Sequence, residues 1–271
     1  MDSTILFFIL SIIVSGIISY YTIYKILRKK LKNKFIKAVI FLIMLVYINK
    51  FNNSFLYPPF ERYRAAGWVE EAFSKNPTYA AIKETDKEAY QKIILNIKDM
   101  IKSGMTRNQM GLKIEDDLTT IINQKRPYAS NEATENYFRS SLKVLEAIKS
   151  RNKVDCYNKL HPEAGVFIDV SKYIDADTAK EELTNLGELI KSAVFQKTNP
   201  PIEKDIKKSL DNSFDALVKI YGKDASLTFT PYDVNIDKAK VCEMTLDFYK
   251  IVLDLPQDTR GMVIKYIQTN G

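Results

Sequence analysis

The segment CYNKLHPE, residues 156–163, contains three side chains of types that can do catalytic chemistry. Cys156 could act as a nucleophile, His161 as its general base, and Glu163 as the group that orients the base. The spacing matches no catalytic signature, however, and Pro162 restricts the backbone beside the histidine. We therefore assign no catalytic residue and keep Cys156, His161 and Glu163 as weak candidates.

Metal binding by His161 with Glu163 is equally weak. The whole chain contains one histidine and two cysteines. The usual zinc sites need four such ligands, or three and a water molecule. We therefore predict no metal site.

The two cysteines, Cys156 and Cys242, indicate a different chemistry. In an exported protein such a pair favours a disulfide, which would remove the Cys156 thiolate. The bond would close a loop of about 86 residues and contribute about 4 kcal/mol in the chain-entropy model. In a cytoplasmic protein both side chains would instead be buried as small apolar groups.

Several acidic residues occur in close pairs that could supply paired carboxylates. Glycosidase chemistry needs two carboxylates across a cleft, but solvated helix faces explain such pairs adequately. The chain has no Gly-rich phosphate loop, no GxSxG elbow and no HExxH motif, so we predict no cofactor. The pairs are Glu70-Glu71, Asp116-Asp117, Glu181-Glu182, and Asp175 with Asp177.

The charge of the chain points to a membrane rather than to nucleic acid. The 271 residues contain 40 Lys and Arg against 33 Asp and Glu, a net charge of +7. Residues 1–50 contain eight basic residues and one acidic residue, so residues 51–271 are neutral. A neutral domain lacks the electrostatic footprint of a nucleic-acid-binding protein, and we predict no nucleic-acid partner.

The basic excess lies beside the most apolar part of the sequence. Residues 4–27 carry a single charge, Lys25 near the end, and as a helix they would reach about 36 Å, enough to cross a bilayer. A cleavable signal peptide is a poor alternative, because no basic residue precedes the stretch and no Ala-x-Ala site follows it. The first helix is therefore predicted to be a signal anchor.

A second apolar run, residues 35–48, is short for a spanning helix unless it continues to about residue 55. We predict a transmembrane hairpin over residues 1–57, with helices at about 4–27 and 35–55 and a basic loop at 28–34. A helix lying on the membrane surface is the alternative for the second run. The side chains expected to contact lipid headgroups are Lys25, Arg28, Lys29, Lys30, Lys32, Lys34 and Lys37.

The basic loop also orients the chain. The positive-inside rule places it in the cytoplasm, so two spanning helices put residues 58–271 on the outer, periplasmic side of the cytoplasmic membrane. If the second run does not span, the same domain is cytoplasmic.

Residues 58–271 are predicted to form a soluble all-α bundle, with a dividing point between two halves near residues 160–170. Helix starts are indicated by Asn76-Pro77, Asn199-Pro200 and Thr230-Pro231. Capping boxes are indicated at Thr85…Glu88, Thr106…Gln109 and Thr178…Glu181.

Apolar residues recur with helical period in six long stretches and predict core-facing helices. A short final helix is predicted over residues 257–268. The stretches cover residues 90–101, 110–121, 137–148, 183–194, 206–221 and 241–255, with Gly104, Gly222 and Pro256 as stop signals.

Two short stretches, residues 165–170 and 226–230, are β-like. They either pair as a small ribbon or serve as extended connectors.

No motif in the chain defines an activity. The function that we expect is a non-catalytic, membrane-anchored helical domain that binds a partner protein in the bacterial cell envelope, beside the lipid bilayer. One alternative is an envelope enzyme that acts on cell-wall or lipid material. Another is an accessory subunit of a membrane transport or secretion complex.

Overall fold

The computed structural model describes residues 57–162, 165–229 and 236–270, and before them only residues 13, 14, 17, 18, 21, 43, 46, 47 and 50. The predicted transmembrane hairpin, with its basic loop, falls largely outside the described residues and stays a prediction. Within the described ranges, none of the helices combines the length and hydropathy that crossing a bilayer requires.

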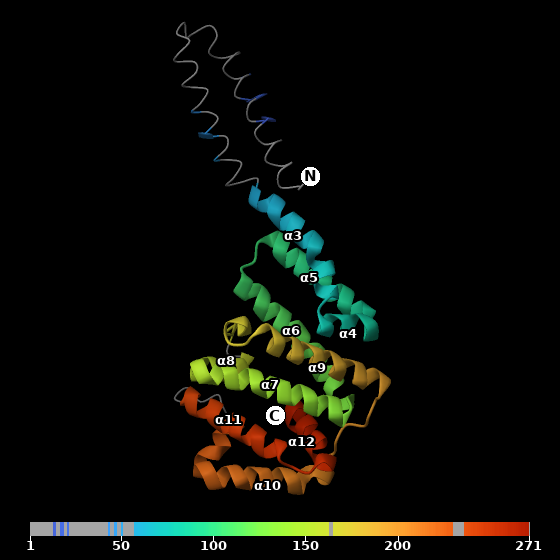
Figure 1. The fold of residues 1–271 in the computed structure, drawn as a ribbon, viewed down its shortest axis with the longest axis vertical. Coiled ribbons are helices and arrows are strands. Elements are labelled where there is room, and N and C mark those ends of the chain that lie inside the picture. Colours follow the sequence, from blue (N-terminus) through green and yellow to red (C-terminus); the bar gives the residue numbers. More distant parts are fainter. Residues whose placement is uncertain are drawn as a thin grey trace. The chain divides into compact units, whose positions relative to one another are not determined.

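The prediction of an all-α bundle is confirmed: the described residues form ten α-helices joined by short connectors and 3₁₀ turns (Figure 1). They are α3 (Tyr57–Ser74), α4 (Pro77–Thr85), α5 (Lys87–Ser103), α6 (Arg107–Lys125), α7 (Asn131–Arg151), α8 (Lys153–Leu160), α9 (Ala176–Phe195), α10 (Glu203–Tyr221), α11 (Lys238–Leu253) and α12 (Gln257–Asn270). The 3₁₀ helices are η3 (Arg126–Tyr128), η5 (Val170–Lys172) and η6 (Gly222–Thr228).

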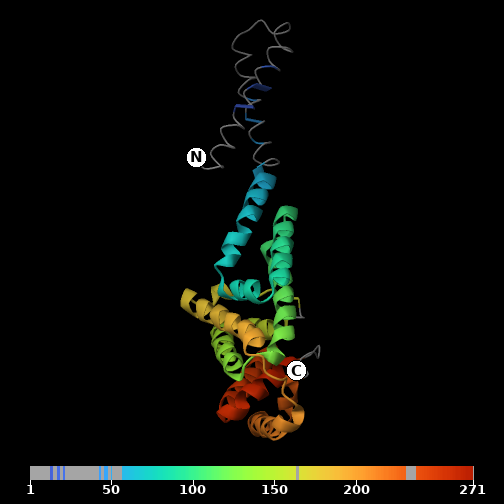
Figure 2. The ribbon, with the colours of Figure 1, turned by 90° about the vertical axis from the view of Figure 1, so that its right-hand side faces the viewer.

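The chain divides into two compact units, Met1–Gly67 and Trp68–Gly271. In the second unit, α9 packs against α4 and α7, and α7 also packs against α8, α11 and α12. The helices α10, α11 and α12 pack together and gather at one end of the unit (Figure 2). A further division near residues 160–170 stays a prediction.

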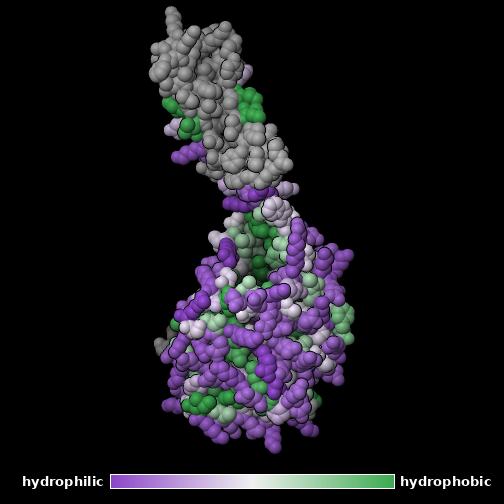
Figure 3. Space-filling model, viewed as in Figure 1, coloured by the Kyte–Doolittle hydropathy of each residue, from purple (hydrophilic) through white to green (hydrophobic). Residues whose placement is uncertain are grey.

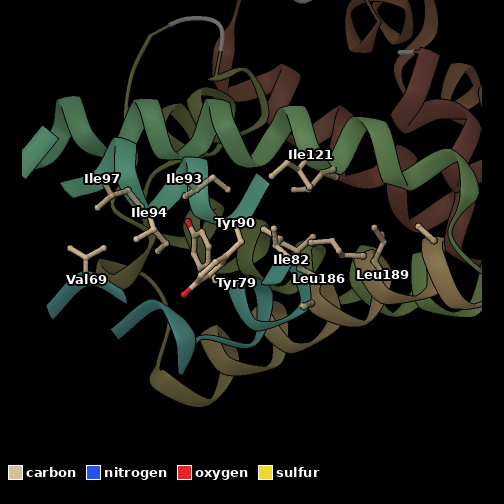
Figure 4. Packing of buried hydrophobic residues seen from close by; sticks show 14 of the residues in the cluster. Val69, Tyr79, Ile82, Tyr90, Ile93, Ile94, Ile97, Ile121, Leu186 and Leu189 are labelled. Carbon is tan, nitrogen blue, oxygen red and sulfur yellow. The ribbon is translucent and has the colours of Figure 1, made fainter. Parts of the chain in front are cut away.

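Three hydrophobic clusters form the core of the second unit. The first lies between α4, α5, α6 and α9, and Figure 4 shows Tyr79, Tyr90 and Ile82 among its aliphatic side chains. The second joins α7, α8 and α11, and the third joins α7, α10, α11 and α12. The apolar stripes predicted from the sequence supply most of these side chains, as helical periodicity requires.

Several predicted helix ends are confirmed. Asn76 caps α4 by accepting hydrogen bonds from the backbone N–H groups of Thr78 and Tyr79. Thr106 and Gln109 form the predicted reciprocal capping box of α6. Gly104 ends α5 with φ of 77°, a left-handed conformation that glycine adopts without strain.

Three other predicted starts are wrong by a few residues. Asp86, not Thr85, caps α5, and Asp175, not Thr178, caps α9. In both cases a neighbouring aspartate, a strong capping residue, occupies the N-cap position. The helix predicted at Asn199-Pro200 begins only at Glu203, after an irregular segment. The Thr230-Pro231 start lies outside the described residues.

The β-like stretches do not pair where the structure describes them. Residues 165–169 form an irregular connector, and residues 226–228 belong to the 3₁₀ helix η6. The ring of Phe167, on the first connector, lies over Gly111 of α6, where an added Cβ would come within 2.3 Å of it. A connector held by its own side chain on a helix needs no ladder partner.

A glycine permits a close crossing between α9 and the start of α4. A Cβ added at Gly187 would lie 2.9 Å from the carbonyl oxygen of Pro77, closer than real side chains approach backbone. This approach lets Thr78 donate a hydrogen bond of 2.9 Å to the carbonyl of Leu183.

Gly187→Ala should therefore force α4 and α9 apart and lower the free energy of unfolding by about 1–2 kcal/mol, despite the better helix propensity of alanine. The control is Gly67→Ala on α3, where nothing lies within 4 Å of the added Cβ. Urea unfolding of the full chain in mild detergent, followed by circular dichroism, measures both. Equal stability of Gly187→Ala and wild type would contradict the tight crossing.

Candidate functional site

The predicted disulfide is present: Cys156 on α8 is bonded to Cys242 on α11, with their Cα atoms 5.9 Å apart. Both residues are 0% exposed and belong to the hydrophobic cluster between α7, α8 and α11. Cys156 therefore has no thiol to act as a nucleophile, and the bond ties an eight-residue helix to the core. A helical domain with such a bond is consistent with an extracytoplasmic location.

His161 lies at the C-terminal end of α8, where its backbone N–H donates to the carbonyl of Tyr157 at 3.0 Å. Its ring packs at 4.6 Å, centroid to centroid, against the ring of Tyr157. The ammonium of Lys238 lies 5.1 Å from the centre of the same tyrosine ring. Glu163 lies outside the described residues, so the structure brings together Cys156 and His161 only as neighbours on one short helix.

The acidic pairs serve mainly as links between and within helices. Burial raises the pKa of Glu182, against the opposing charge of Lys159. Among the described residues, no three His, Cys, Asp or Glu side chains gather as a metal site would require. The observed contacts are Glu70 with Lys98, Glu71 with Lys75, Glu181 with Lys143, Asp117 with Asn96, Glu182 with Ser141, and Asp175 with the start of α9.

A buried cation, Lys265, and a half-buried one, Arg126, lie near the start of α7 and were not expected from the sequence. Lys265 of α12 is 1% exposed and donates hydrogen bonds of 3.0 Å to the carbonyl of Ala129 and the hydroxyl of Thr198. Arg126 donates to the carbonyl of Gln268 at 2.6 Å. Neither cation forms an ion pair within the part of the chain that the structure describes, and burial lowers the pKa of both. Their hydrogen bonds join α12 to the connection between α6 and α7.

A shallow surface groove of about 350 Å³ lies where α7 crosses α9. We call it the α7–α9 groove. It contains small, amide and charged side chains, and one large aromatic side chain, Phe195, which is 62% exposed. Its lining residues are Ser130, Glu132, Ala133, Asn136, Asn185, Glu188, Lys191, Ser192, Phe195 and Gln196.

Sequence reasoning gave no sign of this groove. Its two walls are 49 residues apart at the hydrogen bond that joins them, from the Asn185 amide to the Asn136 carbonyl at 3.3 Å. Polar residues spaced along two helices are an ordinary surface pattern in a sequence. They can be recognised as the lining of one groove only when the crossing of the two helices is known. The only available signal is that Ala133 and Ser192 are small enough to leave a depression at the crossing.

Comparison with known proteins does not add an assignment: no family model, no curated protein and no solved structure matches this chain.

Replacing both cysteines, in Cys156→Ala/Cys242→Ala, should lower the free energy of unfolding by about 4 kcal/mol, because the unfolded chain regains the entropy of an 86-residue loop. Urea unfolding of the oxidised wild type and the double variant measures the difference. Because both cysteines are 0% exposed, the wild-type bond should resist dithiothreitol until urea unfolds the protein. Rapid reduction of the native protein would contradict the buried bond.

The buried amine of Lys265 should make stability depend on pH in a defined direction. Burial lowers its pKa below the unfolded value, so the unfolded chain binds more protons and stability rises with pH up to about 10.4. The stability advantage of wild type over Lys265→Met should therefore grow between pH 7 and pH 10, as measured by urea unfolding. Lys208→Met, at an exposed position on α10, is the matched control. An advantage that shrinks with pH would refute the assignment.

Proposed function

We propose that the chain is a non-catalytic, membrane-anchored protein whose helical domain lies outside the cytoplasm and binds a partner protein of the cell envelope. The observation that carries the proposal is the buried bond between Cys156 and Cys242. It supports an oxidising compartment, and it leaves the strongest nucleophile candidate without a thiol.

The arrangement of the remaining candidates supports binding rather than catalysis. An enzyme site needs a nucleophile, a base and an orienting group that converge on one reacting atom. His161 instead packs on the Tyr157 ring at the end of a short helix, and the acidic pairs are used as ion pairs and caps.

The exposed surface supports a binding role. Figure 3 shows that hydrophilic side chains cover most of the visible face of the second unit. In this unit, the large apolar side chains that are at least 60% exposed are Trp68, Leu95, Phe195, Ile202 and Ile220. Such side chains are candidates for contact with another protein, since aromatic and aliphatic anchors carry much of the binding energy at interfaces.

The first arm of the test is topology. A dual reporter fused to residue 271 of the full chain should sediment with membranes and be active only in its extracytoplasmic form, as two spanning helices require. An active cytoplasmic reporter would refute the proposed location.

The second arm is contact with a partner in living cells. A photo-cross-linking amino acid at Leu95, Phe195 or Ile220 of the full chain should give a light-dependent adduct of defined mass from at least one position. The His161→Ala/Glu163→Gln variant should give the same adduct in the same yield, because those groups have no catalytic role in the proposal. Absence of any adduct at all three positions would contradict a binding function.

A further inference from the structure

The α7–α9 groove has more acidic than basic lining residues, although residues 51–271 as a whole carry no net charge. Glu132 and Glu188 line it, and Lys191 is its only lining cation. The ammonium of Lys191 lies 3.2 Å from the carboxylate of Glu84, which is not a lining residue, and 3.8 Å from that of Glu188. Its positive charge is therefore shared between a carboxylate outside the groove and one that lines it. Glu132 has no ion-pair partner in the described ranges, which leaves carboxylate charge available to a cationic ligand.

The walls of the groove carry groups that match a peptide backbone. Asn136 of α7, Asn185 of α9 and Gln196, just after α9, all line the groove, and the Asn185 amide donates one hydrogen bond to the backbone carbonyl of Asn136. A side-chain amide carries both donors and an acceptor, as each peptide unit does. The backbone N–H and C=O groups inside a helix are already hydrogen-bonded within it. In a groove between two helices, side-chain amides can therefore provide the hydrogen bonds that an extended segment needs.

Phe195 supplies the apolar contact. Its ring is 62% exposed at the last residue of α9, and it lines the same groove as the carboxylates. An apolar side chain of a ligand can pack on such a ring while a lysine or arginine of the same segment reaches a carboxylate. In an extended chain, side chains two residues apart lie on the same side, about 6.6 Å apart.

From these features we infer that the α7–α9 groove binds an extended, basic segment of the partner protein, with a lysine or arginine for the carboxylates and an apolar residue for Phe195. The inference rests on the proposed function and names the chemistry of its partner. The groove does not fit an amphipathic helix, because most of its lining is polar. Its excess of carboxylates disfavours an anionic ligand.

The test uses the full chain in detergent micelles and a random heptapeptide library displayed on phage. Wild type should enrich peptides that pair a lysine or arginine with an apolar residue, most often two positions apart. The Glu132→Lys/Glu188→Lys variant should lose this enrichment. Asp211→Lys/Asp215→Lys is the matched control: both aspartates are exposed on α10, outside the groove, and the change in net charge is the same. It should enrich the same peptides as wild type.

A synthetic peptide of the enriched sequence then gives the magnitude by fluorescence anisotropy. Its dissociation constant should rise about tenfold or more in the groove variant, because two ion pairs are replaced by two repulsions. It should rise several-fold in Phe195→Ala and stay unchanged in the α10 control. Circular dichroism and the thermal midpoint should match wild type in each variant, since every substituted side chain is exposed.

Three outcomes would overturn the inference: enrichment of acidic or purely apolar peptides, no enrichment at all, or equal loss of binding in the groove variant and the α10 control. These outcomes are separate from failure of the proposed function. An adduct in living cells from Leu95 or Ile220, with no selective peptide binding, would keep the binding role and exclude this groove as its site.

Discussion

The rest of the bundle depends on the burial of α7 against several helices at once. Phe138 belongs to the hydrophobic cluster that α7 shares with α10, α11 and α12, whereas Val144 and Ile148 belong to the cluster that it shares with α8 and α11. Tyr137 packs on the edge of the first cluster, beside α9. A helix that is apolar on more than one side is stable only when other helices cover those sides. The need to cover the apolar sides of α7 therefore accounts for the positions of four other helices, α8, α9, α11 and α12.

The shortest of these neighbouring helices is α8, and its short length explains the position of the disulfide. A helix of eight residues is not stable on its own. Asn152 caps it, Tyr157 packs in the core, and Cys156 ties it covalently to α11. The side chains that look most like a catalytic set in the sequence thus hold a short helix in place. Reactive residue types close together in sequence share an environment, but that environment is here a packed interior rather than a cleft.

The sequence predicted the long helices because their apolar residues repeat over three or more turns, as in residues 90–101 of α5. It did not predict α8, whose eight residues are too few to establish a period. It misplaced the caps of α5 and α9 because aspartates 86 and 175 compete with nearby threonines for the same role. The pairing of Cys156 with Cys242 was predictable because there are only two cysteines. The α7–α9 groove was not, since it exists only through a crossing of distant segments.

The charge distribution bears on how such a groove would work under the proposed function. Because residues 51–271 are neutral as a whole, the domain exerts little long-range attraction, and charges are screened beyond about 8 Å at physiological ionic strength. Two exposed carboxylates contribute about 1 kcal/mol each at most, so the groove alone binds a free peptide weakly. Tethering both proteins to one membrane would raise the effective concentration of the partner without any new contact. Under the proposed function, the membrane anchor brings the two proteins close together, which compensates for the weak binding of the groove. The groove in turn determines which partner is bound.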